Sequence, residues 1–184
     1  MQAWSYTLIP AAAAVVGAAV AVTLRPGPVL VSVIQHFAAG VVFAAAAGEI
    51  LPGVKHAGSP WAMLVGGALG VAAMLLVRIL EKRVKGPAGL MSVTGIDILV
   101  DGLVLGIAFA AGAKAGILLT VALTIDVLFL GLTVANELGE GGASRRKVVG
   151  LAAGLVLLLP LGALLGGPVG SLPPSVQGGF LAFG

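Results

Sequence analysis

The 184-residue chain contains no cysteine and few charged residues. The absence of cysteine excludes a disulfide framework and any metal site built on thiolates. Charged residues make up only 9% of the chain, whereas a soluble domain needs roughly 25% to cover its surface. Hydrophobic residues make up 59%, and the mean hydropathy is +1.16. The composition therefore predicts an integral membrane protein.

The basic residues do not indicate nucleic-acid binding, although the pI is near 9.7. They form short clusters beside apolar runs, which is typical of a topology signal, and no nucleic-acid motif is present. At the N-terminus, Arg25 follows the first apolar run, whereas a signal peptide carries its basic residues first. We expect this run to be retained as a membrane helix.

Six apolar segments are long enough to cross a bilayer, since a spanning helix needs about 20 apolar residues. Their approximate ranges are 4–24, 29–51, 60–80, 94–112, 115–136 and 147–167. Turns rich in proline and glycine separate them. A seventh segment, 175–184, is too short to cross, and we expect the natural polypeptide to continue past Gly184. The sequence predicts an all-α polytopic transmembrane helix bundle that forms a single domain over 1–184.

The distribution of lysine and arginine predicts the orientation. Eight of the ten follow odd-numbered helices, namely Arg25, Arg78, Lys82, Arg83, Lys85, Arg145, Arg146 and Lys147, and two, Lys55 and Lys114, follow even-numbered ones. Cytoplasmic loops carry the excess of basic residues. We therefore expect a multi-pass protein of the cell (inner) membrane, with the N-terminus outside and the loops 81–93 and 137–147 in the cytoplasm.

Acidic residues inside the predicted spans are the most informative feature. They are Glu49, Asp97, Asp101 and Asp126. A carboxylate at the bilayer centre costs at least ~2.5–3.5 kcal/mol, and such residues are functional by default. No lysine or arginine lies at comparable depth, so a bound cation, protons or water must compensate for the three aspartates. The alternative, protonated or water-solvated aspartates that cap a helix irregularity, stays open.

The three aspartates are predicted to converge. Asp97 and Asp101 are four residues apart and share one helix face. Asp101 lies roughly 11 Å deep from the cytoplasmic side and Asp126 roughly 16 Å deep from the other side, at 1.5 Å per residue. The short connection between the fourth and fifth helices makes these helices antiparallel neighbours. All-oxygen ligands suit hard divalent cations better than zinc, although zinc accepts carboxylates.

Two further residues are candidate ligands. His36 lies about two turns into the second predicted helix and could bind a metal or relay a proton. Packing between helices is an equally open interpretation of this histidine. Glu49, near the outer end of the same helix, could form an entry site or simply reach water at the interface. Pro160 is expected to bend the sixth helix.

Three passages carry a family resemblance. The second helix contains Phe-Ala-Ala-Gly-Val-Val-Phe (37–43) and ends Glu-Ile-Leu-Pro (49–52). The fourth contains Asp-Ile-Leu-Val-Asp-Gly (97–102), and the sixth contains Gly-Leu-Val-Leu-Leu-Leu-Pro-Leu-Gly-Ala-Leu-Leu-Gly (154–166). With these passages the chain resembles the ZIP (Zrt/Irt-like) family of divalent-metal transporters. The resemblance implies an eight-helix fold in a three-two-three inverted arrangement, a homodimer, and movement of helices one, four, five and six against the rest.

The metal-ligand motifs depart from the family pattern. Asp97 stands at the family's histidine position and Asp101 retains the acidic position. Asp126 matches the first ligand of the fifth helix, but Leu130 and Leu159 replace carboxylates. The resemblance thus implies one metal site, made from Asp97, Asp101 and Asp126, in place of a two-metal centre. The transported ion would be zinc, manganese, iron, cadmium or magnesium.

Three functions remain open from the sequence. The leading one is a divalent metal cation transporter, without enzymatic activity, that works by alternating access around a midplane carboxylate site. The second is a ZIP-like protein that binds metal or another solute without zinc transport. The remote third is an intramembrane aspartyl protease, in which two aspartates share a proton. Gly95-Ile96-Asp97 resembles the Gly-x-Gly-Asp element of such proteases only faintly.

Overall fold

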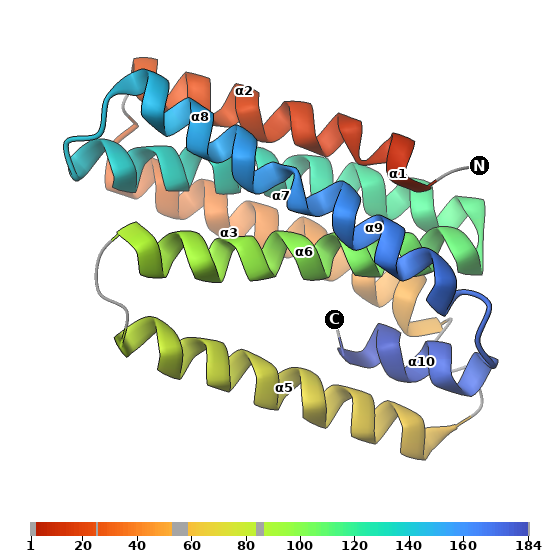
Figure 1. Ribbon diagram of the computed structural model, residues 1–184. Helices are drawn as coiled ribbons and strands as arrows, with labels where there is room; N and C mark the ends of the chain where they lie inside the picture. Colours follow the sequence, from red (N-terminus) through yellow and green to blue (C-terminus); the bar gives the residue numbers. More distant parts are fainter. Residues whose placement is uncertain (1–2, 25, 53–58, 84–86, 184) are drawn as a thin grey trace.

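The computed structural model describes residues 3–24, 26–52, 59–83 and 87–183, and all regular elements within these ranges are helical (Figure 1). The helices are α1 (Ala3–Tyr6), α2 (Leu8–Leu24), α3 (Pro28–Ala45), the π-helix η1 (Ala46–Ile50), α5 (Pro60–Arg83), α6 (Pro87–Ala111), α7 (Ala113–Glu140), α8 (Arg145–Val156), α9 (Leu158–Val169) and α10 (Pro174–Phe183). This confirms the all-α prediction.

Six helical stretches in the described part of the chain are long and apolar enough to cross a membrane. They are Ala3–Leu24, Val29–Gly48, Pro60–Ile79, Met91–Ala111, Ala113–Gly139 and Arg145–Val169. Their order and positions match the six ranges predicted from hydropathy. The chain is therefore a polytopic membrane protein.

The connections between spans are shorter than the sequence suggested. Helix α6 begins at Pro87, inside the predicted loop 81–93, because proline at the first helical position needs no backbone N–H partner. Helix α7 runs on to Glu140, which reduces the predicted loop 137–147 to the residues 141–144. Ser144 then caps α8, accepting a hydrogen bond from the backbone N–H of Lys147 at 3.4 Å.

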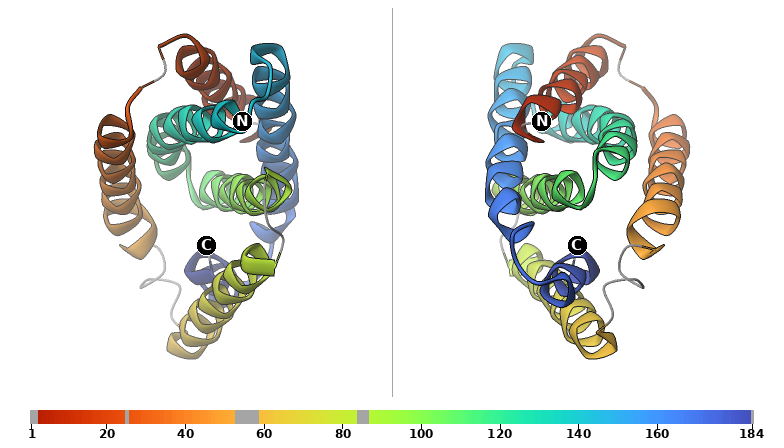
Figure 2. Two further views of the ribbon diagram at one scale, coloured as in Figure 1. Left: turned by 90° about the vertical axis from the view of Figure 1, so that its left-hand side faces the viewer. Right: turned by 90° about the vertical axis from the view of Figure 1, so that its right-hand side faces the viewer.

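Four of the spans form a bundle (Figure 2). Helix α2 packs against α7, α9 packs against α6, α8 packs chiefly against α2, and α6 lies beside α7. Helix α3 packs on the outer side of α7, and α5 pairs with α10 to one side of the bundle (Figures 1 and 2). The bundle comprises the first, fourth, fifth and sixth spans.

Glycines bring helix backbones into direct contact, as expected where no hydrophobic force drives helices together within lipid. A Cβ atom added at Gly17 of α2 would overlap the Leu128 carbonyl of α7. The same holds for Gly102 of α6 against the Leu159 carbonyl of α9. The 29 glycines therefore include positions that fix which helices pair.

Candidate metal centre

Helix α6 carries two of the predicted ligands one turn apart. Its glycine face packs on α9, with Gly102 buried against the α9 backbone. Asp97 and Asp101 occupy an adjoining face, where Asp97 is exposed and Asp101 is half-buried. Because residues four apart stack along a helix, the two carboxyl groups lie on the same side of α6.

Helix α7 supplies the third aspartate. The turn at Gly112 joins α6 directly to α7, so the two helices run antiparallel side by side (Figure 1). Leu105 of α6 packs with Leu119 and Leu123 of α7 in one buried cluster. Asp126 is half-buried and lies one turn further along α7 than this cluster.

The three carboxyl groups are electrostatic neighbours. Asp101 interacts with the charges of both Asp97 and Asp126, and Asp126 interacts with that of Asp97. No lysine or arginine occurs in α6, and the lysine of α7, Lys114, is twelve residues from Asp126. At 1.5 Å per residue this separation is about 18 Å. The three carboxyl groups thus have no basic neighbour close by on their own helices.

One atom of the group is left without a partner. Oδ2 of Asp101 is buried, and it accepts no hydrogen bond from the described residues. An unpaired buried polar group costs about 1–3 kcal/mol, and more if it is charged. A cation, a proton or a water molecule is the kind of partner that would satisfy this oxygen.

The side chains do not converge into a complete coordination shell. Among the described residues, no group of three or more His, Cys, Asp or Glu side chains is close enough to hold a metal ion. The structure brings the aspartates near enough for their charges to interact, on two adjacent helices. Binding one ion by all three would require them to approach further.

His36 and Glu49 are not joined to the aspartates in this structure. His36 is exposed on α3, and its Nδ1 lies 2.7 Å from the Ser32 carbonyl oxygen of its own helix. The neighbouring Gln35, and not His36, faces α7, because Gln35 Nε2 donates to Thr133 Oγ1 at 3.1 Å. Glu49 falls in η1, and its side chain lies outside the described residues. Their roles as ligands stay predictions.

The hydrogen bond between Gln35 and Thr133 is the polar contact that sequence reasoning missed. It ties α3 to α7, two helices that are 98 residues apart at this point. Thr133 also donates to the Phe129 carbonyl oxygen at 3.0 Å, as expected for a threonine inside a membrane helix. Polar residues inside apolar spans indicate that hydrogen-bond partners are needed. Which partners they find depends on which faces of α3 and α7 meet.

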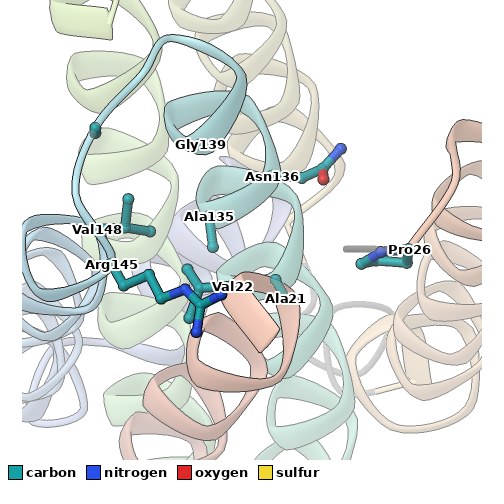
Figure 3. A pocket seen from close by; sticks show the side chains of 9 residues that line it. Ala21, Val22, Pro26, Ala135, Asn136, Gly139, Arg145 and Val148 are labelled. Atoms are coloured by element: carbon teal, nitrogen blue, oxygen red, sulfur yellow. The ribbon is translucent and has the colours of Figure 1, made fainter. Parts of the chain in front are cut away.

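Two larger cavities lie away from the aspartates. One of about 360 Å³ lies between the C-terminal ends of α2 and α7 and the start of α8, where the Arg145 side chain extends toward Val22 (Figure 3). The other, of about 430 Å³, is almost wholly apolar and is formed chiefly by α5 and α10. No acidic residue lines either of these two cavities.

No family model matches the chain, and no curated protein matches it. Function must therefore be argued from the carboxyl groups and the helices that carry them.

Proposed function

We propose that this chain transports divalent metal cations, with Asp97, Asp101 and Asp126 as the ligands of the translocated ion. The observation that carries the proposal is the buried, unpartnered Asp101 Oδ2 in a group of three interacting carboxyls within membrane-spanning helices. Intramembrane acids without basic partners mark ion pathways in general. A translocated cation would neutralise the charge and occupy the free oxygen.

The donor chemistry favours hard cations. The aspartates offer only oxygen ligands, which suit Mg²⁺ and Mn²⁺, and a zinc or ferrous ion also accepts carboxylates. Three protein ligands leave further coordination positions for water or for another side chain, such as Glu49. Mg²⁺ in particular retains several water molecules when it is bound by proteins.

The arrangement of the helices supports a transporter of ZIP-like type. The bundle consists of the first, fourth, fifth and sixth spans, the set that the resemblance expects to move against the other helices. Both helices that carry the aspartates belong to this bundle, so its movement would carry a bound ion. Assembly as a homodimer in the cell membrane is part of the same proposal.

Cation binding and uptake by the purified chain in liposomes test this function. Zn²⁺, Mn²⁺ and Mg²⁺ are titrated, and uptake is followed, for the native chain, Asp101→Asn and the control Glu137→Gln, whose exposed carboxyl lies near the end of α7. Removing one charged ligand is expected to weaken binding by about 10-fold or more and to abolish uptake. The control should resemble the native chain.

The outcomes separate the alternatives. Unchanged binding and uptake in Asp101→Asn would show that the site assignment is wrong. Cation binding without uptake by the native chain would favour a binding protein over a transporter. Cleavage of a transmembrane reporter peptide, lost in both Asp97→Asn and Asp126→Asn, would instead favour the protease.

A further inference from the structure

Two spans of the bundle each contain a one-residue turn, and a proline follows both turns. The first span is interrupted at Thr7, between α1 and α2, and the sixth at Leu157, between α8 and α9. A proline follows each break three residues later, as Pro10 and Pro160. Because proline has no N–H, it cannot donate the usual helical hydrogen bond to the turn before it, and the helix is interrupted there.

The two halves of the sixth span pack on different helices. Val148 and Ala152 of α8 belong to a buried cluster with Ala18 of α2 and Leu138 of α7. Helix α9 instead packs on α6, where a Cβ at Gly162 would overlap the Leu99 carbonyl. The break at Leu157 is therefore the point where the chain leaves one set of helices for another.

The first span changes partners in the same way. Helix α1 packs chiefly on α9, and its Tyr6 ring lies 4.6 Å from the Phe109 ring of α6, measured between ring centroids. Helix α2 packs on α7. We call α2, α7 and α8 the first body and α1, α6 and α9 the second body. The chain passes between these bodies directly at Thr7, at Leu157 and at the Gly112 turn.

The closest contacts of glycines with a neighbouring helix backbone in the bundle lie within the bodies. Within the first body, a Cβ at Gly131 would overlap the Ala14 carbonyl, and within the second, one at Gly166 would overlap the Leu103 carbonyl. Between the bodies, a Cβ at Gly116 of α7 would instead meet the Phe109 side chain. Backbones in direct contact cannot slide without separating, whereas side chains can change rotamer as packed helices shift.

The seam between the bodies also contains free space. A small void of about 10 Å³ is lined on one side by Thr94 and Ile98 of α6. On the other side it is lined by residues of α2, α7 and α8, among them Leu130 and Val156. The same seam also contains the buried cluster of Leu105, Leu119 and Leu123, so this void is a local gap in side-chain packing.

We propose that the two bodies move against each other about Thr7, Leu157 and the Gly112 turn, and that this movement sets the separation of the aspartates. Asp126 belongs to the first body, and Asp97 and Asp101 belong to the second. Closing the seam would bring the three carboxyl groups around one cation, and opening it would release the ion. The consequence for cation binding rests on the proposed function, whereas the movement itself does not.

Pairs of spin labels on the full chain in liposomes test the movement, and the cysteine-free sequence allows each label to be placed alone. Ser92→Cys with Glu137→Cys spans the seam from α6 to α7, and Glu137→Cys with Arg146→Cys stays within the first body. All three side chains are exposed. Distances are measured by pulsed electron paramagnetic resonance with and without Zn²⁺ or Mg²⁺.

The seam pair is expected to show two distances that differ by several ångströms, roughly up to one helical turn of about 5 Å, and cation should favour one of them. The pair within the first body should show one narrow distance throughout. The two-body movement would be overturned if the distances of the seam pair were as narrowly distributed as those of the pair within the first body and did not change on adding cation.

The proposed hinge at Leu157 is tested by Pro160→Ala, which restores the backbone N–H that residue 160 lacks. This variant should narrow the distribution of distances in the seam pair, while an unchanged distance within the first body shows that the fold is intact.

The outcomes distinguish the two proposals. Two seam distances without any response to cation would support the movement and contradict its coupling to cation binding. A single fixed seam distance together with cation uptake would contradict the movement and leave transport standing.

Discussion

At the scale of single residues, Asp101 is the side chain that most constrains function. Its neighbours Asp97 and Asp126 are also acids, and its buried Oδ2 has no protein partner among the described residues. A buried group of this kind destabilises a fold unless something compensates, so a residue with no function would be expected to be apolar here. A cation, a proton or a water molecule would each compensate for this oxygen.

Acid should weaken cation binding at this group. Ligand carboxylates must be ionised, so lowering the pH lets protons compete with the metal ion. A ligand that binds only the folded state raises stability, by about 2.7 kcal/mol at 100 times its Kd. The rise in unfolding temperature on adding Mn²⁺ should therefore shrink as the pH falls. In Asp101→Asn the rise should be small at every pH, and a rise that grows in acid would contradict the carboxylate site.

At the scale of helices, neighbouring glycines in α9 give a matched test of packing. A Cβ at Gly166 would overlap the Leu103 carbonyl of α6, whereas one at Gly167 would meet nothing within 4 Å. Gly166→Ala should lower the free energy of unfolding by about 1–3 kcal/mol, since overpacking displaces a backbone. Gly167→Ala should be neutral or slightly stabilising. Denaturation in detergent measures both, and equal effects would refute close packing of α6 and α9.

Hydropathy predicted the spans but not all of their internal structure. The interruption of the sixth span at Leu157 lies three residues before Pro160, whose missing N–H acts locally. The break at Thr7 has the same local cause in Pro10, and the sequence therefore contained its signal. The π-helix η1 lies just before Pro52, but its wider hydrogen-bond pattern is not predicted by the sequence, and neither is the choice of partners for α8 and α9. Those features depend on which backbones approach one another in three dimensions.

At the scale of the whole molecule, the sequence placed the aspartates correctly on adjacent antiparallel helices, because the Gly112 turn is too short for any other arrangement of α6 and α7. It could not predict how closely the carboxyl groups approach. That distance depends on the rotation of α6 and α7 about their axes, which the glycine contacts on their other faces fix. The sequence likewise could not show that Gln35, and not His36, faces α7.

The basic residues also predict the orientation of the whole molecule in the membrane. Single cysteines at Gly141, in the turn before α8, and at Ser171, after α9, should be labelled from opposite sides. Gly141 has a φ of −72°, so another residue fits there without strain, whereas its neighbour Gly142 has a φ of 81° and is unsuitable.

Because Arg145, Arg146 and Lys147 directly follow the turn, the positive-inside rule places Gly141→Cys in the cytoplasm. A membrane-impermeant maleimide added to intact cells should therefore label Ser171→Cys and spare Gly141→Cys until the membrane is permeabilised. Labelling of Gly141→Cys alone in intact cells would invert the orientation, and with it the side from which Asp97 is closest to water.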